Sequence, residues 1–152
     1  MDQYEEKALK DIEQYGCHIL HIMAEDEYPG FSYSIGIEKT SSQPEIIITG
    51  LNQEVAHWIA NEYNNRVKAG EIFKPNEYYS GFLEGFDITF KEVSPEYYAE
   101  YYAEYFGWTN WLYKGNNFKV LQFIYPDTSG VWPWDSEASA DFKWFLPKLY
   151  AN

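Results

Sequence analysis

The residues best suited to chemistry in this chain are three histidines, a single cysteine and a glutamate that follows a proline. His18 and Glu45 are candidates for an acid–base pair, because histidine titrates near neutral pH and a carboxylate can exchange or orient its proton. His18 and His21 lie three residues apart in a segment expected to form a strand, so they should face opposite sides and cannot share a metal ion.

Sequence motifs of established catalytic chemistry are missing from the chain. It contains no Gly-x-Ser-x-Gly pattern, no His-Glu-x-x-His pattern and no glycine-rich phosphate loop. The residue types and spacings therefore predict no catalytic set, no metal site and no cofactor. They favour a protein that is not an enzyme.

A face of small residues marks the segment from Phe31 to Ile37. Its large side chains alternate with Ser32, Ser34 and Gly36, and a period of two predicts a strand. Small side chains allow another group to approach the backbone closely. A packed helix, a ligand or solvent could cover this face. Glu45, in the next expected strand, is predicted to cap nearby backbone N–H groups or to belong to a binding site.

Aromatic content and net charge are the unusual features of the composition. The 152 residues include 15 Tyr, 10 Phe and 6 Trp, and the formal net charge is −13. Each buried ring removes about 150–250 Å² from water, so apolar area does not limit the core and some rings are expected to line a surface or cleft. The negative charge repels nucleic acid and attracts basic partners.

Length and composition predict one domain over residues 1–152. One cysteine allows no internal disulfide, and the acidic N-terminal residues do not resemble a secretory signal. Strictly apolar runs reach only three residues, as in Ile46–Ile48, which is too short to cross a membrane. We therefore expect a cytoplasmic protein without a membrane association, and the sequence leaves its oligomeric state open.

The order of predicted elements indicates an α+β fold, with a mixed or antiparallel sheet of about five strands packed with two or three helices. Strands are expected at about 17–23, 31–37, 45–49, 86–93 and 118–124, and residues 71–85 are expected to be irregular. Helices are expected at about 2–15 and 53–69, with caps at Asp2 and Asn52. A tyrosine-rich helix should begin at Pro95, and a short helix should follow residue 138 and break at Pro147.

Several short motifs are shared with a protein family. They are Gly16-Cys17-His18-Ile19, Tyr33-Ser34-Ile35-Gly36-Ile37, Pro44-Glu45, Gly50-Leu51, Gln122, Tyr125-Pro126-Asp127 and Pro133-Trp134. In these motifs and their order the chain resembles the bacterial and phage family described as domain of unknown function 4262. The resemblance implies a single intracellular domain and no particular reaction. Cys17 replaces the usual tryptophan and Gln43 replaces a frequent histidine, so neither a nucleophile nor a base is expected at these positions.

Taken together, these observations predict a non-enzymatic binding protein with an aromatic-lined, acidic site. The residues expected at this site are His18, Tyr33, Ser34, Glu45, Gln122, Trp132 and Trp134. The site would sequester a small ligand, with a nucleotide among the candidates, or inhibit a partner protein that has a basic surface. A role in immunity or phage anti-defence fits a small acidic protein of this kind.

Two alternatives stay open at this stage. One is a small hydrolase or transferase that uses His18 and Glu45 as an acid–base pair. The other is an acidic mimic of nucleic acid. If the ligand were a nucleotide, Arg66, Lys68 or Lys119 would have to hold its phosphates against the overall negative charge.

Overall fold

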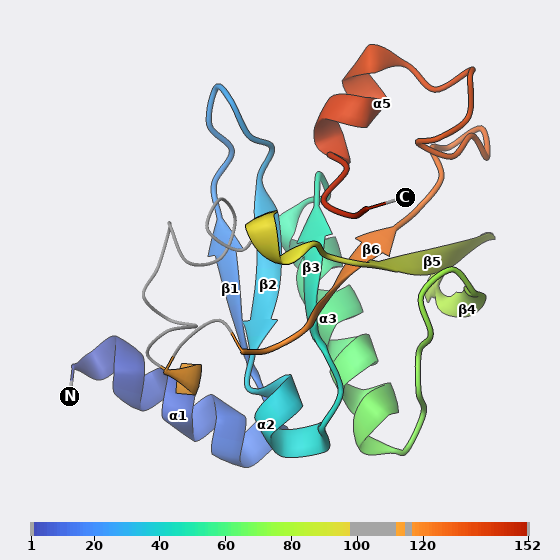
Figure 1. The fold of residues 1–152 in the computed structure, drawn as a ribbon. Helices are drawn as coiled ribbons and strands as arrows, with labels where there is room; N and C mark the ends of the chain where they lie inside the picture. The colour runs from blue at the N-terminus through green and yellow to red at the C-terminus, as the bar shows by residue number, and fades with distance from the viewer. Residues whose placement is uncertain (1, 98–111, 115–116, 152) are drawn as a thin grey trace.

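The computed structural model describes residues 2–97, 112–114 and 117–151 (Figure 1). The helices are α1 (Gln3–Tyr15), α2 (Ile37–Ser41), α3 (Gln53–Lys68) and α5 (Ala140–Phe145), with a 3₁₀ helix η1 (Pro95–Tyr97). The strands are β1 (His18–Ile22), β2 (Phe31–Ile35), β3 (Glu45–Thr49), β4 (Tyr78–Leu83), β5 (Phe86–Glu92) and β6 (Val120–Ile124). These elements confirm the predicted α+β class.

The described strands form one six-stranded mixed sheet in the order β1-β2-β3-β6-β5-β4. β3 and β6 run parallel, with Glu45 opposite Val120 and Ile47 opposite Gln122, and the other neighbouring pairs are antiparallel. The parallel pair lies at the centre, so both strands end at the same edge of the sheet (Figure 1). This edge is where α5 lies.

Strand β4 corrects the prediction that residues 71–85 are irregular. Gly81 interrupts the alternation of side chains that would have indicated a strand, and its φ of 93° lies in the left-handed region. The pairing of β4 with β5 shifts register between Tyr79 and Leu83, as in a β-bulge. An irregular strand of this kind has no clear period in the sequence, which is why about five strands were expected instead of six.

Helix ends follow the predicted capping residues. Asp2 accepts a hydrogen bond from the Glu5 backbone N–H at 2.8 Å, and α1 ends at Gly16, whose φ is 99°. Asn52 accepts from the Val55 backbone N–H at 2.9 Å and begins α3. These local signals fixed the bounds of both helices to within one or two residues.

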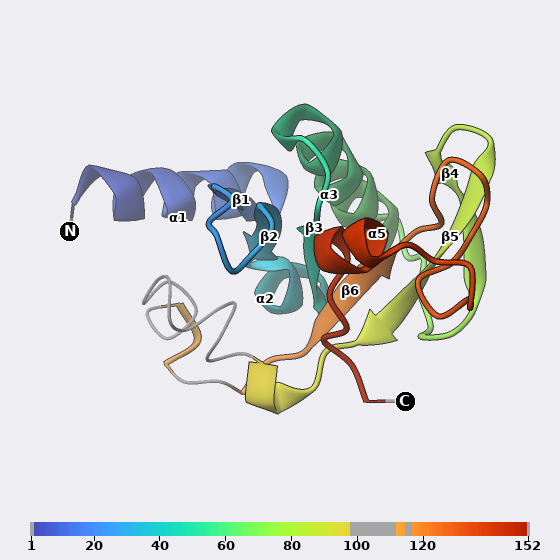
Figure 2. The same ribbon diagram turned by 90° about the horizontal axis from the view of Figure 1, so that it is seen from above.

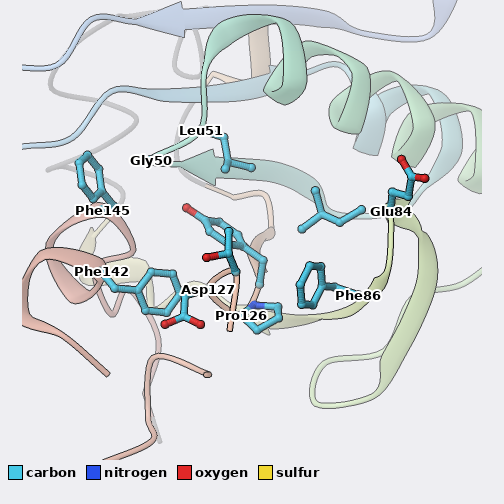
Figure 3. A pocket seen from close by; sticks show the side chains of 11 residues that line it. Gly50, Leu51, Glu84, Phe86, Pro126, Asp127, Phe142 and Phe145 are labelled. Carbon is cyan, nitrogen blue, oxygen red and sulfur yellow. The ribbon is translucent and has the colours of Figure 1, made fainter. Parts of the chain in front are cut away.

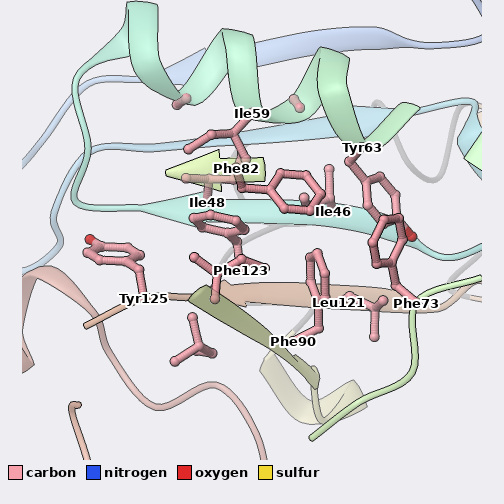
Figure 4. Close-up of a cluster of buried hydrophobic side chains, with 14 of the residues drawn as sticks. Ile46, Ile48, Ile59, Tyr63, Phe73, Phe82, Phe90, Leu121, Phe123 and Tyr125 are labelled. Atoms are coloured by element: carbon pink, nitrogen blue, oxygen red, sulfur yellow. The ribbon is translucent and has the colours of Figure 1, made fainter. Parts of the chain in front are cut away.

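One face of the sheet packs against α3 (Figure 2). Ser32 of β2 lies opposite Ile48 of β3, and Ile48 packs with residues of α3, so the small-residue face of β2 looks toward this helix. The packed-helix interpretation of that face is therefore confirmed. Farther along the sheet, aromatic rings fill the space below α3 (Figure 4). These rings are Tyr63, Phe73, Phe82, Phe90, Phe123 and Tyr125.

The second face of the sheet packs against part of α1 and the C-terminal residues. Ala8 and Ile12 of α1 join Tyr33 and Ile35 in a separate buried cluster, which also includes Leu149. The C-terminal segment is held by main-chain pairing of Val93 with Tyr150. Both faces of the central strands are therefore buried, as their continuous apolar sequence indicates.

Two expected elements differ in the structure. β2 ends at Ile35, and Gly36, with a φ of 104°, turns the chain into the short helix α2, so Ile37 packs on the α3 face instead of continuing the strand. The tyrosine-rich helix expected from Pro95 begins as η1, and its repeat from residue 98 onward lies outside the described residues.

Large apolar side chains are exposed at several places on the described surface, as the aromatic surplus predicts. The most exposed rings are Tyr4, Tyr15, Trp58, Tyr78, Trp134, Trp144 and Phe145. Trp58 lies on the exposed side of α3. No helix within the described part of the chain is both long enough and apolar enough to cross a membrane.

Candidate functional site

Glu45 is fully buried at the start of β3 and is surrounded by hydrogen-bond donors. The donors are the Ser34 hydroxyl (2.9 Å), the backbone N–H groups of Gly36 (3.2 Å), Ile37 (3.1 Å) and Glu38 (3.0 Å), and the Tyr113 hydroxyl. An ionised carboxylate has about four acceptor positions on its two oxygens. The acceptor positions of the Glu45 carboxylate are therefore all occupied by donors of the protein itself.

These contacts give Glu45 a structural role. Gly36 has no side chain with which to cap α2, so the first N–H groups of that helix point to the Glu45 carboxylate instead. The Ser34 hydroxyl also accepts a hydrogen bond from the Ile46 backbone N–H at 3.0 Å. The predicted capping role of Glu45 is thus confirmed, and its side chain links β2, α2 and β3.

Burial raises the pKa of Glu45 to about 7, against the hydrogen bonds from Tyr113, Glu38, Ser34 and Ile37, which lower it. The cost of removing a charge from water is the larger effect at this site. A raised carboxyl pKa is typical of catalytic groups, but here the carboxyl is enclosed by main-chain donors. Its environment explains the pKa without a reaction.

The other buried residues of the predicted site also have structural contacts. Tyr33 lies on the opposite face of β2 from Ser34 and is buried in the second core cluster. Gln122 donates from Nε2 to the Pro147 carbonyl at 2.7 Å and accepts from the Leu149 backbone N–H at 3.3 Å. Gln122 therefore anchors the C-terminal segment to the sheet.

His18 lies on β1, the first strand in the order of the described sheet, with Asp11 of α1 beside it. The His18 Nδ1 and Asp11 Oδ2 atoms are 2.8 Å apart. Burial opposes ionisation of Asp11, but the hydrogen bonds from His18 and Lys7 outweigh it and lower the pKa of Asp11. The carboxylate partner of His18 in this structure is therefore Asp11, a residue that sequence reasoning did not single out.

His21 belongs to a second hydrogen-bonded group. Its Nδ1 lies 2.6 Å from the Ser32 hydroxyl, and its Nε2 lies 3.2 Å from Nδ1 of His57 on α3. His18 pairs with Ile35 and His21 with Ser32 across the strands, so the two histidines face opposite sides of the sheet, as predicted. The described residues contain no group of three or more His, Cys, Asp or Glu that could hold a metal ion.

A polar cleft lies beside β1 and reaches both histidines. We call it the histidine cleft; its lining includes Asp11, His18, His21, His57, Asn61 and Asn64, and its volume is about 630 Å³. Asn64 is buried, and within the described structure its Oδ1 atom accepts no hydrogen bond. The neighbouring Cys17 is also buried, and burial raises the pKa of its thiol to about 12, which makes it a poor nucleophile.

A second cavity lies where the parallel strands β3 and β6 end (Figure 3). We call it the aromatic pocket; it is lined by Gly50, Leu51, Leu83, Glu84, Phe86, Tyr125, Pro126, Asp127, Thr128, Phe142 and Phe145 and has a volume of about 430 Å³. Phe142 and Phe145 of α5 lie on one side and Phe86 of β5 on the other. Its lining surface is mostly apolar.

The floor and rim of the aromatic pocket are fixed by local contacts. Gly50 has a φ of 77°, and a Cβ atom there would lie 2.4 Å from the Phe145 carbonyl oxygen, so only glycine allows α5 to pack this closely. The Tyr125 hydroxyl donates to the Thr49 carbonyl at 2.7 Å. Asp127 Oδ1 accepts from the backbone N–H groups of Ser129 and Val131, as expected of a turn residue.

The predicted tryptophans lie together on the loop that follows β6. The Trp132 and Trp134 rings stack with centroids 5.3 Å apart and an interplanar angle of 5°. Trp134 is 44% exposed. Neither ring is part of the aromatic pocket.

The structure therefore brings together only parts of the predicted site. Ser34 contacts Glu45 and Trp132 contacts Trp134, whereas His18 lies in the histidine cleft and Gln122 lies under the C-terminal segment. The aromatic pocket contains none of the predicted site residues. One sequence feature could have indicated the pocket. Two of the motifs behind the family resemblance, Gly50-Leu51 and Tyr125-Pro126-Asp127, each follow a buried strand.

Comparison with known proteins identifies the family. The family model described as Domain of unknown function (DUF4262) matches residues 11–139. The match covers most of the chain, which therefore belongs to this family, as the resemblance implied. No curated protein and no solved structure matches the chain.

The capping role of Glu45 predicts a loss of stability in Glu45→Gln. A glutamine side chain has one acceptor oxygen, so its NH₂ group must face at least one backbone N–H that now donates to Glu45. The lost hydrogen bond should lower the free energy of unfolding by about 1–3 kcal/mol. Urea unfolding at about pH 8, where the carboxyl is ionised, measures the change. The control Glu13→Gln, at an exposed position of α1, should change the free energy of unfolding by less than about 0.5 kcal/mol. Equal effects of the two substitutions would contradict the capping role.

The pairing of Asp11 with His18 predicts a shift in titration. In His18→Ala, Asp11 loses a hydrogen bond that favours its ionised form, so its pKa should rise toward the ordinary value of 3.8. NMR titration of the side-chain carboxyl carbon measures this pKa directly. Because the pKa of Asp11 is lowered in the folded protein, its contribution to stability is present above the ordinary value and is lost as the pH falls. An unchanged Asp11 pKa in the variant would show that the pair does not form.

Proposed function

We propose that this member of the DUF4262 family is a non-enzymatic binding protein that holds a small, largely apolar ligand in the aromatic pocket. The observation that carries the proposal is the pocket itself, a cavity of about 430 Å³ with rings on opposite sides. Small-molecule sites typically measure about 300–1,000 Å³ and combine apolar walls with a few polar groups. The aromatic pocket matches this description in both size and lining.

The position of the pocket supports the same proposal. It lies at the carboxyl ends of two adjacent parallel strands, where ligands commonly bind in sheets that contain parallel strands. The two carboxylates at its lining, those of Glu84 and Asp127, disfavour an anionic ligand. The ligand that fits best is a neutral or cationic molecule with a flat apolar body, because such a body can pack against Phe86, Phe142 and Phe145.

The aromatic lining of the pocket is not fully covered by the rest of the protein. Phe145 is 45% exposed although it belongs to α5 and lines the pocket. Inhibition of a basic partner protein, a role in immunity or anti-defence, and mimicry of nucleic acid are further proposals. They rest on the net charge of −13, whereas the small-ligand proposal rests on a defined cavity.

One observation favours a second candidate function, the hydrolase or transferase alternative. In the histidine cleft, a carboxylate lies on Nδ1 of a histidine, which is the arrangement that orients a general base. The base would be His18 and its positioning residue Asp11. Glu45 is not suited to this role, because its oxygens are used by the caps of α2 and by Ser34.

The aromatic pocket can be tested with the neutral fluorescent probe N-phenyl-1-naphthylamine, whose emission increases in apolar sites. Phe145→Ala removes a ring from the pocket, and its lost contact area should weaken probe binding by about tenfold. Trp58→Ala is the control, because Trp58 is a 52% exposed ring on α3 that does not line the pocket, and it should leave probe binding unchanged. Equal probe affinity in the wild type and in Phe145→Ala would contradict the proposal.

The catalytic alternative can be tested by hydrolysis of p-nitrophenyl acetate. If His18 is a general base positioned by Asp11, both His18→Ala and Asp11→Asn should reduce kcat/KM by at least about tenfold. His57→Ala is the control, because this histidine lines the same cleft but contacts His21 instead of Asp11 in the described structure. A rate that is the same in all these variants and in the wild type would rule out this alternative.

A further inference from the structure

A group of lysines lies together at one place on this acidic protein. Lys91 of β5, Lys143 of α5 and Lys148 of the C-terminal segment line one cavity of about 510 Å³, together with Pro133, Trp134, Leu146 and Tyr150. We call this cavity the lysine pocket. Its described lining contains no Asp or Glu, although the chain has 24 acidic and only 11 basic residues.

Two of the three lysines in the lysine pocket lie beside aromatic rings, and Lys143 lies on helix α5. The Lys91 Nζ lies 5.0 Å from the Trp134 ring centre and 5.4 Å from that of Tyr150, and it donates a hydrogen bond to Asn76. The Lys148 Nζ lies 5.5 Å from the Tyr150 ring centre. Two ammonium groups therefore lie near a single ring, and both would attract an anion bound beside it.

The rings of the lysine pocket are themselves held in position. Trp134 stacks on Trp132, and Tyr150 is fixed by the main-chain pairing of its residue with Val93. Gln122 holds the backbone of the preceding segment at Pro147 and Leu149. The pocket is thus formed by segments that are far apart in sequence and are tied together by the core.

We propose that the lysine pocket binds an aromatic anion of the nucleoside monophosphate type. Lysine ammonium groups are common ligands of phosphate, and aromatic side chains stack with nucleobases. Pro133 and the 44% exposed Trp134 provide surface for the base, and the three lysines provide charge for the phosphate. This site is separate from the aromatic pocket and does not depend on its function.

From the sequence, other basic residues, among them Arg66 and Lys68, were expected to hold the phosphates of a nucleotide. Arg66 instead pairs with Glu71 at 2.6 Å, and Lys68 donates to the Tyr15 carbonyl at 2.9 Å. Lys91, Lys143 and Lys148 are separated by as many as 57 positions (91 to 148) and show no motif. Only the packing of α5 and the C-terminal segment beside β5 brings them together.

Isothermal titration of the full chain with adenosine 5′-monophosphate tests the proposal, with adenosine and inorganic phosphate as separate probes. The monophosphate should bind at least about tenfold more tightly than either probe, because only it contacts both the rings and the lysines. Lys143→Gln/Lys148→Gln should weaken its binding by at least about tenfold. Both lysines are exposed, so this variant should keep the wild-type fold, which circular dichroism verifies.

The matched control is Lys10→Gln/Lys39→Gln, which removes the same charge from two exposed lysines outside the pocket. It should change the affinity by less than about twofold, because screened charges at a distance contribute little. Phe145→Ala should also leave the affinity unchanged, which separates this site from the aromatic pocket. Equal binding of phosphate and the monophosphate, equal effects of the two lysine pairs, or no saturable binding would each overturn the proposal.

Discussion

The buried carboxylate of Glu45 is the interaction on which the arrangement of the central strands depends. It lies at the point where β2 ends, α2 begins and β3 starts, and its hydrogen bonds join all three elements. The N-terminus of α2 is a cluster of backbone donors without a side-chain cap of its own, and burial of these donors without an acceptor would be costly. A single charged side chain satisfies them, and this requirement explains its burial better than a catalytic role does.

The position of β3 determines where the cavities of the protein can form. Glu45 fixes the beginning of the strand, and five residues later Gly50 forms the floor of the aromatic pocket against Phe145. The parallel pairing with β6 places Pro126 and Asp127 at the same edge. The same helix, α5, then separates the aromatic pocket from the lysine pocket, with Phe142 and Phe145 facing the first and Lys143 lining the second.

Local signals in the sequence predicted local structure well. Asp2, Gly16 and Asn52 set the helix bounds, and of the three candidates for what covers the Ser32 and Ser34 face, the packed helix is the one found. The candidate site was harder to predict, because its cavities depend on which strands pair and in what direction. The parallel pairing of β3 with β6 joins distant segments of the chain. The bulge in β4 interrupts the period of a strand, and the Asp11–His18 contact links a helix to a strand, so neither is marked by a sequence period. Residue type alone therefore singled out buried structural residues such as Glu45 and Gln122.

The central claim is that the Glu45 carboxylate has a structural role and that the ligand binds in the aromatic pocket. An NMR titration of the labelled wild-type protein with N-phenyl-1-naphthylamine tests this claim most directly. The backbone amide signals of Gly50, Leu51, Asp127 and Phe145 should shift and saturate, and the signals of His18 and Ser34 should stay unchanged. Shifts centred on the histidine cleft, or shifts that never saturate and are spread over the whole surface, would contradict the claim.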